Sequence, residues 1–428
     1  MVPVVGTGLM PVRQSLESGA VVIVQETSAT PAVAINATFL AGAGDEPGDQ
    51  HGVAYLMGRV IDRGTERHSA DLIAEALDER GVSLQVATTR HTTAISCTCL
   101  ADDFDELLSI IVDVARRPTF PEGELAKRRA ESITALRQDE DNPAVRASQA
   151  LSALLYGDEH PYGRALKGSV ETLERIEREA IAGFHARNIR PAMLSLVVVG
   201  DVDAQHAIDR ADEELKGWNG RPASPIVVPP PAVNPARRES TIVMPGKSQS
   251  DIAYGFATIS RLDPRFYAYW LMNNILGQFG LGGRLADNIR ERQGMAYYAF
   301  SSFDPTFGES ALTVRAGVDP RNVERAVDAI DMEIRHLGEG GPTMTEVDET
   351  RAYLIGSIPR LLETNDSIAA FLQNCERFGL GLDFDRRLPA LLLAVTVDEI
   401  RSAAAEVLVP ERAAVAVAGP AVPDEATA

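Results

Sequence analysis

The chain alternates between short apolar strands and longer amphipathic helices, and the same order of elements occurs in both halves. In the first half the alternating segment AVAINATFL (32–40) and an acidic turn precede AYLMGRVI (54–61). In the second half DIAYGFATISRLDP (251–264) precedes FYAYWLMNNIL (266–276). Alternation of apolar and polar residues predicts a half-buried strand, and apolar residues three to four apart predict a helix.

A second pair of segments matches in the same way. The segment TTAISCTCLADDFDELLSIIVDVA (92–115) predicts a strand, an acidic helix start and a helix with Leu107, Ile111 and Val114 on one face. Its counterpart in the second half is SALTVRAGVDPRNVERAVDAIDMEI (310–334). Both segments therefore predict a strand followed directly by a helix.

The two halves also end alike. A helix-rich stretch follows in each half, at 124–156 and 345–378, and each half closes with a helix and a strand, at 171–202 and 396–419. Four matched segments in one order predict a duplicated α+β unit, and argue against a doubly wound sheet with one nucleotide site.

A proline-rich stretch divides the chain near its middle. The segment GWNGRPASPIVVPPPAVNPARR contains six prolines, which cannot continue a helix or a central strand and favour an extended spacer. We predict an N-terminal α+β domain at 1–218, a linker at 219–238 and a C-terminal α+β domain at 239–428. At 428 residues the chain is also long enough for two cores.

Composition and charge narrow the functional classes. An apolar fraction of 45% and a charged fraction of 24% are those of an ordinary globular protein. The formal net charge of −20 is spread along the chain, which argues against a surface that binds nucleic-acid phosphates. It leaves two interpretations open, a solubilising acidic exterior or a cavity that attracts basic peptides.

Cysteines and apolar runs give little further information. Three cysteines provide no disulfide framework, and Cys97 and Cys99, two apart on a predicted strand, fit buried side chains better than a metal pair. The longest apolar run, near 194–199, has the length of a buried strand, so we expect no membrane insertion. The first residues lack the features of a signal peptide. The compartment stays open between the cytoplasm and, for a processed chain, the periplasm.

The segment GVAYLMGRVIDRGT, from Gly52 to Thr65, resembles the zinc-binding segment of the pitrilysin, insulinase and mitochondrial-processing-peptidase family. That family carries H-x-x-E-H within G-V-A-H-F-L-E-H-M-x-F-K-G-T. In this chain Tyr55 stands at the first histidine, Gly58 at the glutamate and Arg59 at the second histidine. The resemblance implies two homologous α+β domains, each with a mainly antiparallel sheet covered by helices.

These replacements remove the chemistry of the motif. Side chains four apart on a helix share one face, so two histidines can bind zinc while the glutamate activates its water. A tyrosine is a poor ligand at neutral pH, a guanidinium repels a divalent cation, and Gly58 cannot accept a proton.

The third zinc ligand of the family is also missing. In ESITALRQDEDNP, Ala135 falls at the place of the ligating glutamate, with 75 residues between it and Arg59. Glu131, one helical turn earlier, fits a solvated carboxylate better than a substitute ligand. His51 has no second ligand at a suitable spacing, and His160, in the family-like run HPYGR, is expected to be a turn or packing residue. We therefore expect no zinc in this chain.

The second half keeps another part of the family pattern. LGQFGLGGRLADNIRERQGMAYYAF resembles the segment in which the second domain contributes an arginine and a tyrosine to the active site. On that match these residues are Arg284 and Tyr297, and Tyr298 remains an alternative because a register error of one exchanges them. A guanidinium and a phenol can donate hydrogen bonds to a peptide carbonyl or to the oxyanion that forms from it.

The pattern of lost ligands and kept donors resembles the inactive subunit of two-chain members of the family. The resemblance implies a heterodimer with a homologous zinc-bearing subunit, in which this chain binds peptide and helps the partner's site. The alternative is a structural subunit of a larger assembly, like the zinc-free core subunits of the bc1 complex. A self-sufficient hydrolase with another site is less consistent with the sequence, since no nucleophile arrangement stands out.

Overall fold

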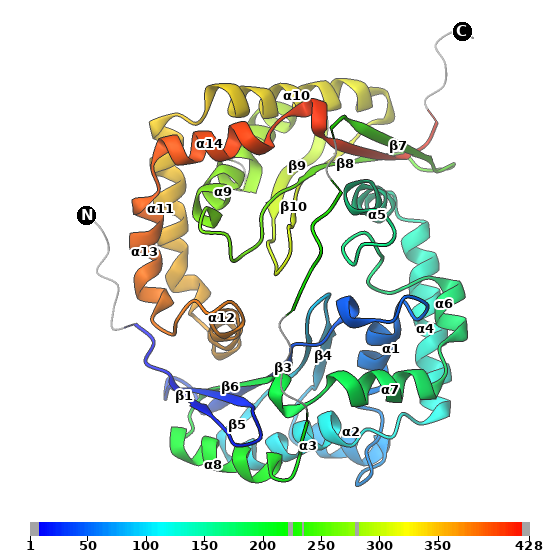
Figure 1. Ribbon diagram of the computed structural model, residues 1–428, viewed down its shortest axis with the longest axis vertical. Helices are drawn as coiled ribbons and strands as arrows, with labels where there is room; N and C mark the ends of the chain where they lie inside the picture. The colour runs from blue at the N-terminus through cyan, green and yellow to red at the C-terminus, as the bar shows by residue number, and fades with distance from the viewer. Residues whose placement is uncertain (1–7, 221–225, 233–234, 279–281, 422–428) are drawn as a thin grey trace. The chain divides into compact units, whose positions relative to one another are not determined.

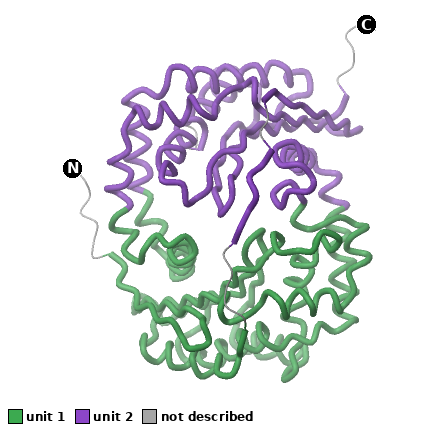
Figure 2. The backbone as a smooth tube through the Cα atoms, viewed as in Figure 1, with its two compact units in different colours: residues 1–136, 165–225, 357–387 green, residues 137–164, 226–356, 388–428 purple. Residues whose placement is uncertain are grey.

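Each half of the chain contributes one β-sheet. The structure, a computed structural model, describes residues 8–220, 226–232, 235–278 and 282–421 (Figure 1). The chain divides into two compact units (Figure 2). Unit 1 comprises 1–136, 165–225 and 357–387, and unit 2 comprises 137–164, 226–356 and 388–428.

Unit 1 contains a six-stranded sheet with the order β1-β2-β6-β3-β5-β4. The strands β2 and β6 are parallel, and the other neighbours are antiparallel. The bounds are β1 (Val12–Ser15), β2 (Val21–Glu26), β3 (Ala32–Phe39), β4 (Gln85–Thr88), β5 (Thr93–Leu100) and β6 (Leu194–Gly200).

Unit 2 contains a five-stranded sheet with the order β7-β11-β8-β10-β9. Here β7 and β11 are parallel and the other neighbours are antiparallel, so the connectivity repeats that of β2-β6-β3-β5-β4. The bounds are β7 (Arg238–Val243), β8 (Ser250–Ala257), β9 (Ala296–Phe303), β10 (Ala311–Val318) and β11 (Ala414–Gly419). Two mainly antiparallel sheets with one connectivity confirm the predicted duplicated α+β fold.

Helices cover both faces of the sheet in unit 1. One face packs on the main core, while Ile368, Ala369 and Leu372 of α12 pack on the other face against β2, β3 and β6. The helices that lie wholly in this unit are α1 (Val53–Val60), α2 (Ala70–Asp78), α3 (Phe104–Arg116), α6 (Val170–Arg175), α7 (Arg178–Asn188), α8 (Ala204–Leu215) and α12 (Asn365–Arg377).

The sheet of unit 2 is covered in the same way. Ala147, Leu151 and Leu155 of α5 pack against alanines of β8 and β11. Asn142 starts α5 by accepting hydrogen bonds from the N–H groups of Ala144 and Val145. The helices wholly in this unit are α5 (Pro143–Tyr156), α9 (Phe266–Asn273), η4 (Asn274–Gln278), η6 (Ala286–Arg292), α10 (Val323–Gly340) and α14 (Val397–Val407).

Each unit therefore includes a helix from the opposite half of the sequence. The units differ in this respect from the contiguous domains predicted at 1–218 and 239–428, because 137–164 group with unit 2 and 357–387 with unit 1. Helices α4 (Glu122–Glu140), α11 (Met344–Leu361) and α13 (Phe384–Ala394) contribute residues to both units. Parts of the predicted linker, 221–225 and 233–234, lie outside the described residues.

Candidate functional site

The degenerate motif lies on α1, which begins at a glycine. Gly52 has a φ of +94°, which favours glycine, and the N–H groups of Gly52 and Ala54 donate to the Glu46 carboxylate at 3.0 and 2.9 Å. Tyr55 and Arg59 follow four residues apart, half-buried and exposed respectively. The helix and its i, i+4 spacing are thus present without the ligands.

Arg59 forms an ion pair with the next helix. Its Nη2 donates to Oε2 of Glu131 on α4 at 3.1 Å, and Nη1 of Arg128 donates to both Glu131 oxygens at 2.9 and 2.7 Å. Hydrogen bonds from Arg128, together with the charges of Arg128 and Arg59, lower the pKa of Glu131. Glu131 is therefore a partly exposed carboxylate that pairs with two guanidinium groups.

Gly58 is buried where the strand β4 meets α1. A Cβ atom placed on Gly58 would lie 2.4 Å from Oγ1 of Thr88, the last residue of β4. That distance is far below an ordinary contact, so a side chain at Gly58 requires Thr88 to move. The position that carries the family's glutamate is therefore crowded by the Thr88 side chain in this chain.

Arg284 stands before η6, in the place that the sequence predicts. Its Nε donates to Oε1 of Glu346 at 2.6 Å, and its Nη2 donates to Oε2 of Glu346 at 2.9 Å and to the carbonyl of Gly341 at 3.2 Å. Its side chain is 18% exposed. Arg284 therefore ties η6 to the start of α11, and within the described part of the chain no hydrogen bond uses its Nη1.

Glu346 is the strongest electrostatic partner of Arg284. It also accepts hydrogen bonds from the N–H and the hydroxyl of Thr343, at 2.7 and 2.8 Å. Burial by itself raises the pKa of Glu346, but the hydrogen bonds from Arg284 and Thr343 outweigh it and lower the pKa to about 2.

Tyr297 lies on the edge strand β9, where the register with β10 shifts. Tyr298 pairs with Gly317 and Ala296 pairs with Val318, so Tyr297 has no partner residue in the ladder. Its side chain is 83% exposed. Among the described residues its hydroxyl makes no hydrogen bond, so it is available to a ligand.

Tyr298 has a different environment. It is half-buried, and its hydroxyl donates a short hydrogen bond to Oδ1 of Asp251. Burial, together with that hydrogen bond, raises the pKa of the phenol. Over the described residues no hydrogen bond joins Arg284 to Tyr297 or Tyr298.

Sequence reasoning passed over two features near these residues. Arg290, whose side chain is 43% exposed, lies in η6, and its carbonyl accepts from the N–H of Gly294 at the turn into β9. It is a more exposed cation than Arg284, and the first arginine in the run N-I-R-E-R was the available signal. The second feature is a cavity beside Asp251, and its only signal in the sequence was a charged residue at the start of a buried strand.

Comparison with known families identifies the fold. The family described as insulinase (peptidase family M16) matches residues 21–168, and the family described as peptidase M16 inactive domain matches residues 175–354. This chain belongs to peptidase family M16.

Relatives of this M16 chain match along most of its length. A Streptomyces coelicolor protein called an uncharacterized zinc protease is 26% identical over 96% of this chain and 90% of its own. A Helicobacter pylori protein called a non-peptidase homolog is 24% identical over 89% of this chain and 87% of its own.

Solved structures agree with this fold. A Pseudomonas fluorescens protein described as a peptidase M16 inactive domain superposes with a TM-score of 0.90, at 25% identity, over 97% of this chain and 98% of the other. A Helicobacter pylori protease matches in fold with a TM-score of 0.87 at 17% identity, over 96% of this chain and all of the other.

The residues of this M16 chain do not fit a zinc ion at the degenerate motif. Tyr55, Gly58, Arg59 and Ala135 supply no imidazole or carboxylate, and the Arg59 cation already pairs with Glu131. In the part of the chain that the structure describes, no group of three or more histidine, cysteine, aspartate or glutamate side chains could hold a metal.

His51 and His160 contact protein groups. Nδ1 of His51 lies 3.9 Å from Oε2 of Glu46. His160 is buried, with Nε2 2.8 Å from the carbonyl of Pro229, Nδ1 3.0 Å from the N–H of Tyr162, and its ring stacked on Tyr156. This confirms that His160 is a turn and packing residue.

No helix in the described residues is long and apolar enough to cross a membrane.

Proposed function

We propose that this chain is the zinc-free subunit of a heterodimeric metallopeptidase of family M16. In this role it pairs with a homologous zinc-bearing subunit, binds the peptide substrate and stabilises the transition state at the partner's site. The observation that carries the proposal is the contrast between a motif without ligands, in which Arg59 pairs with Glu131 and Thr88 crowds Gly58, and an exposed Tyr297.

The chemistry of Tyr297 suits a substrate-facing role. A phenol O–H is a neutral donor at physiological pH, and on an exposed strand edge it can reach a peptide carbonyl without first breaking an internal hydrogen bond. Such a donor is worth most where negative charge develops on the carbonyl oxygen during attack. The partner's metal would supply the activated water, and this chain would supply the donor.

Arg284 has a double role in this proposal. Its Nε and Nη2 are committed to Glu346, which fixes the guanidinium, and Nη1 is left to donate to the peptide. A fixed donor loses little conformational entropy on binding.

One observation favours the second candidate, a structural subunit of a larger assembly. The ion pair between Arg284 and Glu346 links two helical segments of unit 2, and that contact alone accounts for an arginine at this position. On this reading Tyr297 would have no partner substrate and the chain would copurify with several unrelated subunits.

Reconstitution separates the two candidates. The proposal predicts that the purified chain contains no stoichiometric zinc and has negligible peptidase activity, but forms a stable complex with a zinc-bearing homologue. The mixture should cleave peptides in a chelator-sensitive manner. Chelator-sensitive cleavage by this chain alone, with contaminating protease excluded, would refute the proposal, and copurification only with unrelated subunits would favour the structural role.

A further inference from the structure

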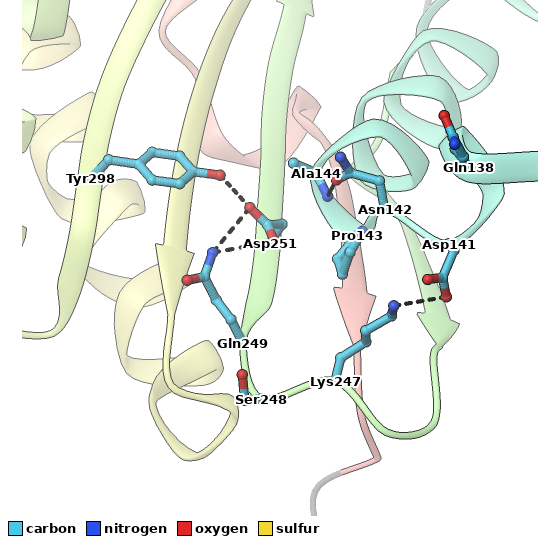
Figure 3. A pocket seen from close by; sticks show the side chains of 10 residues that line it. All are labelled: Gln138, Asp141, Asn142, Pro143, Ala144, Lys247, Ser248, Gln249, Asp251 and Tyr298. Atoms are coloured by element: carbon cyan, nitrogen blue, oxygen red, sulfur yellow. Dashed lines mark hydrogen bonds and ion pairs between the residues drawn. The ribbon is translucent and has the colours of Figure 1, made fainter. Parts of the chain in front are cut away.

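A cavity of about 560 Å³ lies in unit 2 between the start of β8, the strand β9 and the start of α5 (Figure 3). Its volume is within the range of about 300–1,000 Å³ that is typical of small-ligand sites. The polar groups that matter for its chemistry are those of Asp141, Lys247, Gln249, Asp251 and Tyr298.

The least exposed charged residue among these is Asp251, at 5%. It accepts hydrogen bonds from two neutral donors, the hydroxyl of Tyr298 and Nε2 of Gln249, the latter at 3.5 and 3.3 Å (Figure 3). Among the described residues no lysine or arginine forms an ion pair with it. A buried carboxylate normally has a cationic partner, because neutral donors only partly offset the cost of removing the charge from water.

A glycine in the neighbouring strand allows Tyr298 and Gln249 to reach Asp251. Gly317 lies between Asp251 and Tyr298 in the cross-strand register. A Cβ atom on Gly317 would lie 2.5 Å from Nε2 of Gln249 and 2.6 Å from Cε1 of Tyr298. The glycine therefore allows both side chains to lie across β10 beside Asp251, which lines the cavity.

The mouth of the cavity already contains an ammonium group. Nζ of Lys247 lies 2.7 Å from Oδ1 of Asp141 (Figure 3). Asp141 is 78% exposed, so this pair is held weakly and can exchange with another cation.

The remaining charges near the cavity disfavour an anionic ligand. Asn142 already occupies the N–H groups of Ala144 and Val145 at the start of α5. Arg315 of β10 is also engaged, because its Nη2 donates to the carbonyl of Ala144 at 3.3 Å. An anion would therefore face two carboxylates and find these donors engaged.

We propose that this cavity binds a primary ammonium or guanidinium group on a flexible aliphatic stem. Asp251 pairs with the cationic head, and Asp141 exchanges Lys247 for it at the mouth. The proposal depends on the proposed function only for the source of the cation, a lysine or arginine side chain of a bound peptide. The net charge of −20 would steer such a ligand toward the protein.

The test uses the full chain without a partner and measures binding by calorimetry. The probes are N-acetyl-arginine methylamide and its neutral isostere N-acetyl-citrulline methylamide, and we expect the citrulline compound to bind at least 10-fold more weakly. Asp251→Asn should weaken binding of the arginine compound at least 10-fold. Asp348→Asn, an exposed carboxylate elsewhere in unit 2, is the matched control and should not change it.

The variant Lys247→Met tests the proposal through the direction in which the affinity for the arginine compound changes. Removing the internal ammonium should tighten binding of the arginine compound several-fold, since the ligand no longer competes with Lys247. Unchanged or weaker binding in this variant would overturn the proposal, as would binding of N-acetyl-glutamate methylamide that Lys247→Met abolishes. This variant changes a mouth residue, so it stays informative if Asp251→Asn fails to fold.

Free putrescine distinguishes the source of the cation. Weaker binding of putrescine than of the arginine compound supports a peptide side chain, and equal or tighter binding overturns that assignment in favour of free amines. Since all these measurements are made on the isolated chain, failure of the cavity proposal and failure of the peptidase partnership are distinguishable.

Discussion

Gly58 and Thr88 decide at the scale of single residues whether the lost motif can be restored. Sequence comparison shows which ligands are missing, but it does not show that β4 lies against α1 at Gly58. That closeness depends on a contact between residues 30 positions apart, which no local pattern reports. The absence of the glutamate was thus predictable, and the close approach of Thr88 to its position was not.

Restoring the glutamate should therefore destabilise the protein. We expect Gly58→Glu to lower the free energy of unfolding by about 1–3 kcal/mol, because the new side chain overlaps Thr88 in a buried position. Gly123→Glu is the matched control on α4, where a Cβ meets nothing within 4 Å, and should cost nothing. Urea unfolding measures both, and an unaffected Gly58→Glu would show that Thr88 moves away freely.

Tyr297 and Tyr298 illustrate a second limit at this scale. The sequence left open which tyrosine serves a ligand, because neighbouring strand residues point to opposite faces and a register error of one exchanges them. The irregular register opposite Gly317 and Val318 leaves Tyr297 exposed and directs Tyr298 to Asp251. The bulge has no signal in the run MAYYAF itself.

At the scale of elements, the sequence predicted the order of strands and helices but not which sheet each helix covers. The apolar positions of α5 and α12 show that each helix has a buried face, and this pattern is the same whichever sheet it meets. Ala147, Leu151 and Leu155 meet β8 and β11, while Ile368 and Leu372 meet β3 and β6. For that reason the contiguous domains predicted from the sequence did not place α5 in unit 2 or α12 in unit 1.

The placement of α12 in unit 1 predicts that a mutation in this helix, although it lies in the C-terminal half of the sequence, destabilises unit 1. Leu372 on α12 is fully buried, so Leu372→Ala should cost about 2–5 kcal/mol. Amide hydrogen exchange should quicken in β3 and β6 while β8 and β10 stay protected. Leu393→Ala, at a half-exposed leucine of α13, is the control. Faster exchange confined to unit 2 would contradict the assignment of α12.

The start of α11 should respond to acid. The pKa of Glu346 is lowered to about 2 from an ordinary value of 4.5, so the fold favours its ionised form. This contribution is present above pH 4.5 and is lost as the pH falls toward 2. Because the pair is partly exposed, we expect about 1–2 kcal/mol at neutral pH.

Glu346→Gln should remove that dependence. The stability difference between the unchanged chain and Glu346→Gln, measured by urea unfolding, should be largest near pH 6 and should shrink between pH 4.5 and 3. Glu339→Gln, at an exposed carboxylate of α10, should show no such trend. A stability difference that stays constant down to pH 3 would mean that the contribution of the Arg284–Glu346 pair does not depend on the charge of Glu346.

At the scale of the whole molecule, two roles compete for the same fold. Membership of family M16 follows from matches that span most of the chain, yet its relatives include one called an uncharacterized zinc protease and one called a non-peptidase homolog. Fold therefore does not decide between a working subunit and a structural one. The decision depends on whether the donors of unit 2 act on a substrate.

The variant Tyr297→Phe tests this directly in the reconstituted pair. It removes one hydroxyl and keeps the ring, so we expect turnover to fall roughly 10²-fold, about 3 kcal/mol of barrier, with assembly unchanged by size-exclusion chromatography. Tyr353→Phe on α11 should leave turnover unaltered.

Arg284→Ala should be at least as damaging as Tyr297→Phe, but it also breaks the ion pair with Glu346, so its unfolding must be measured in parallel. Arg290→Ala leaves that pair intact and shows whether the more exposed cation is the one that acts. Unchanged turnover in all three variants, with assembly intact, would mean that these donors do not serve catalysis and would favour the structural role.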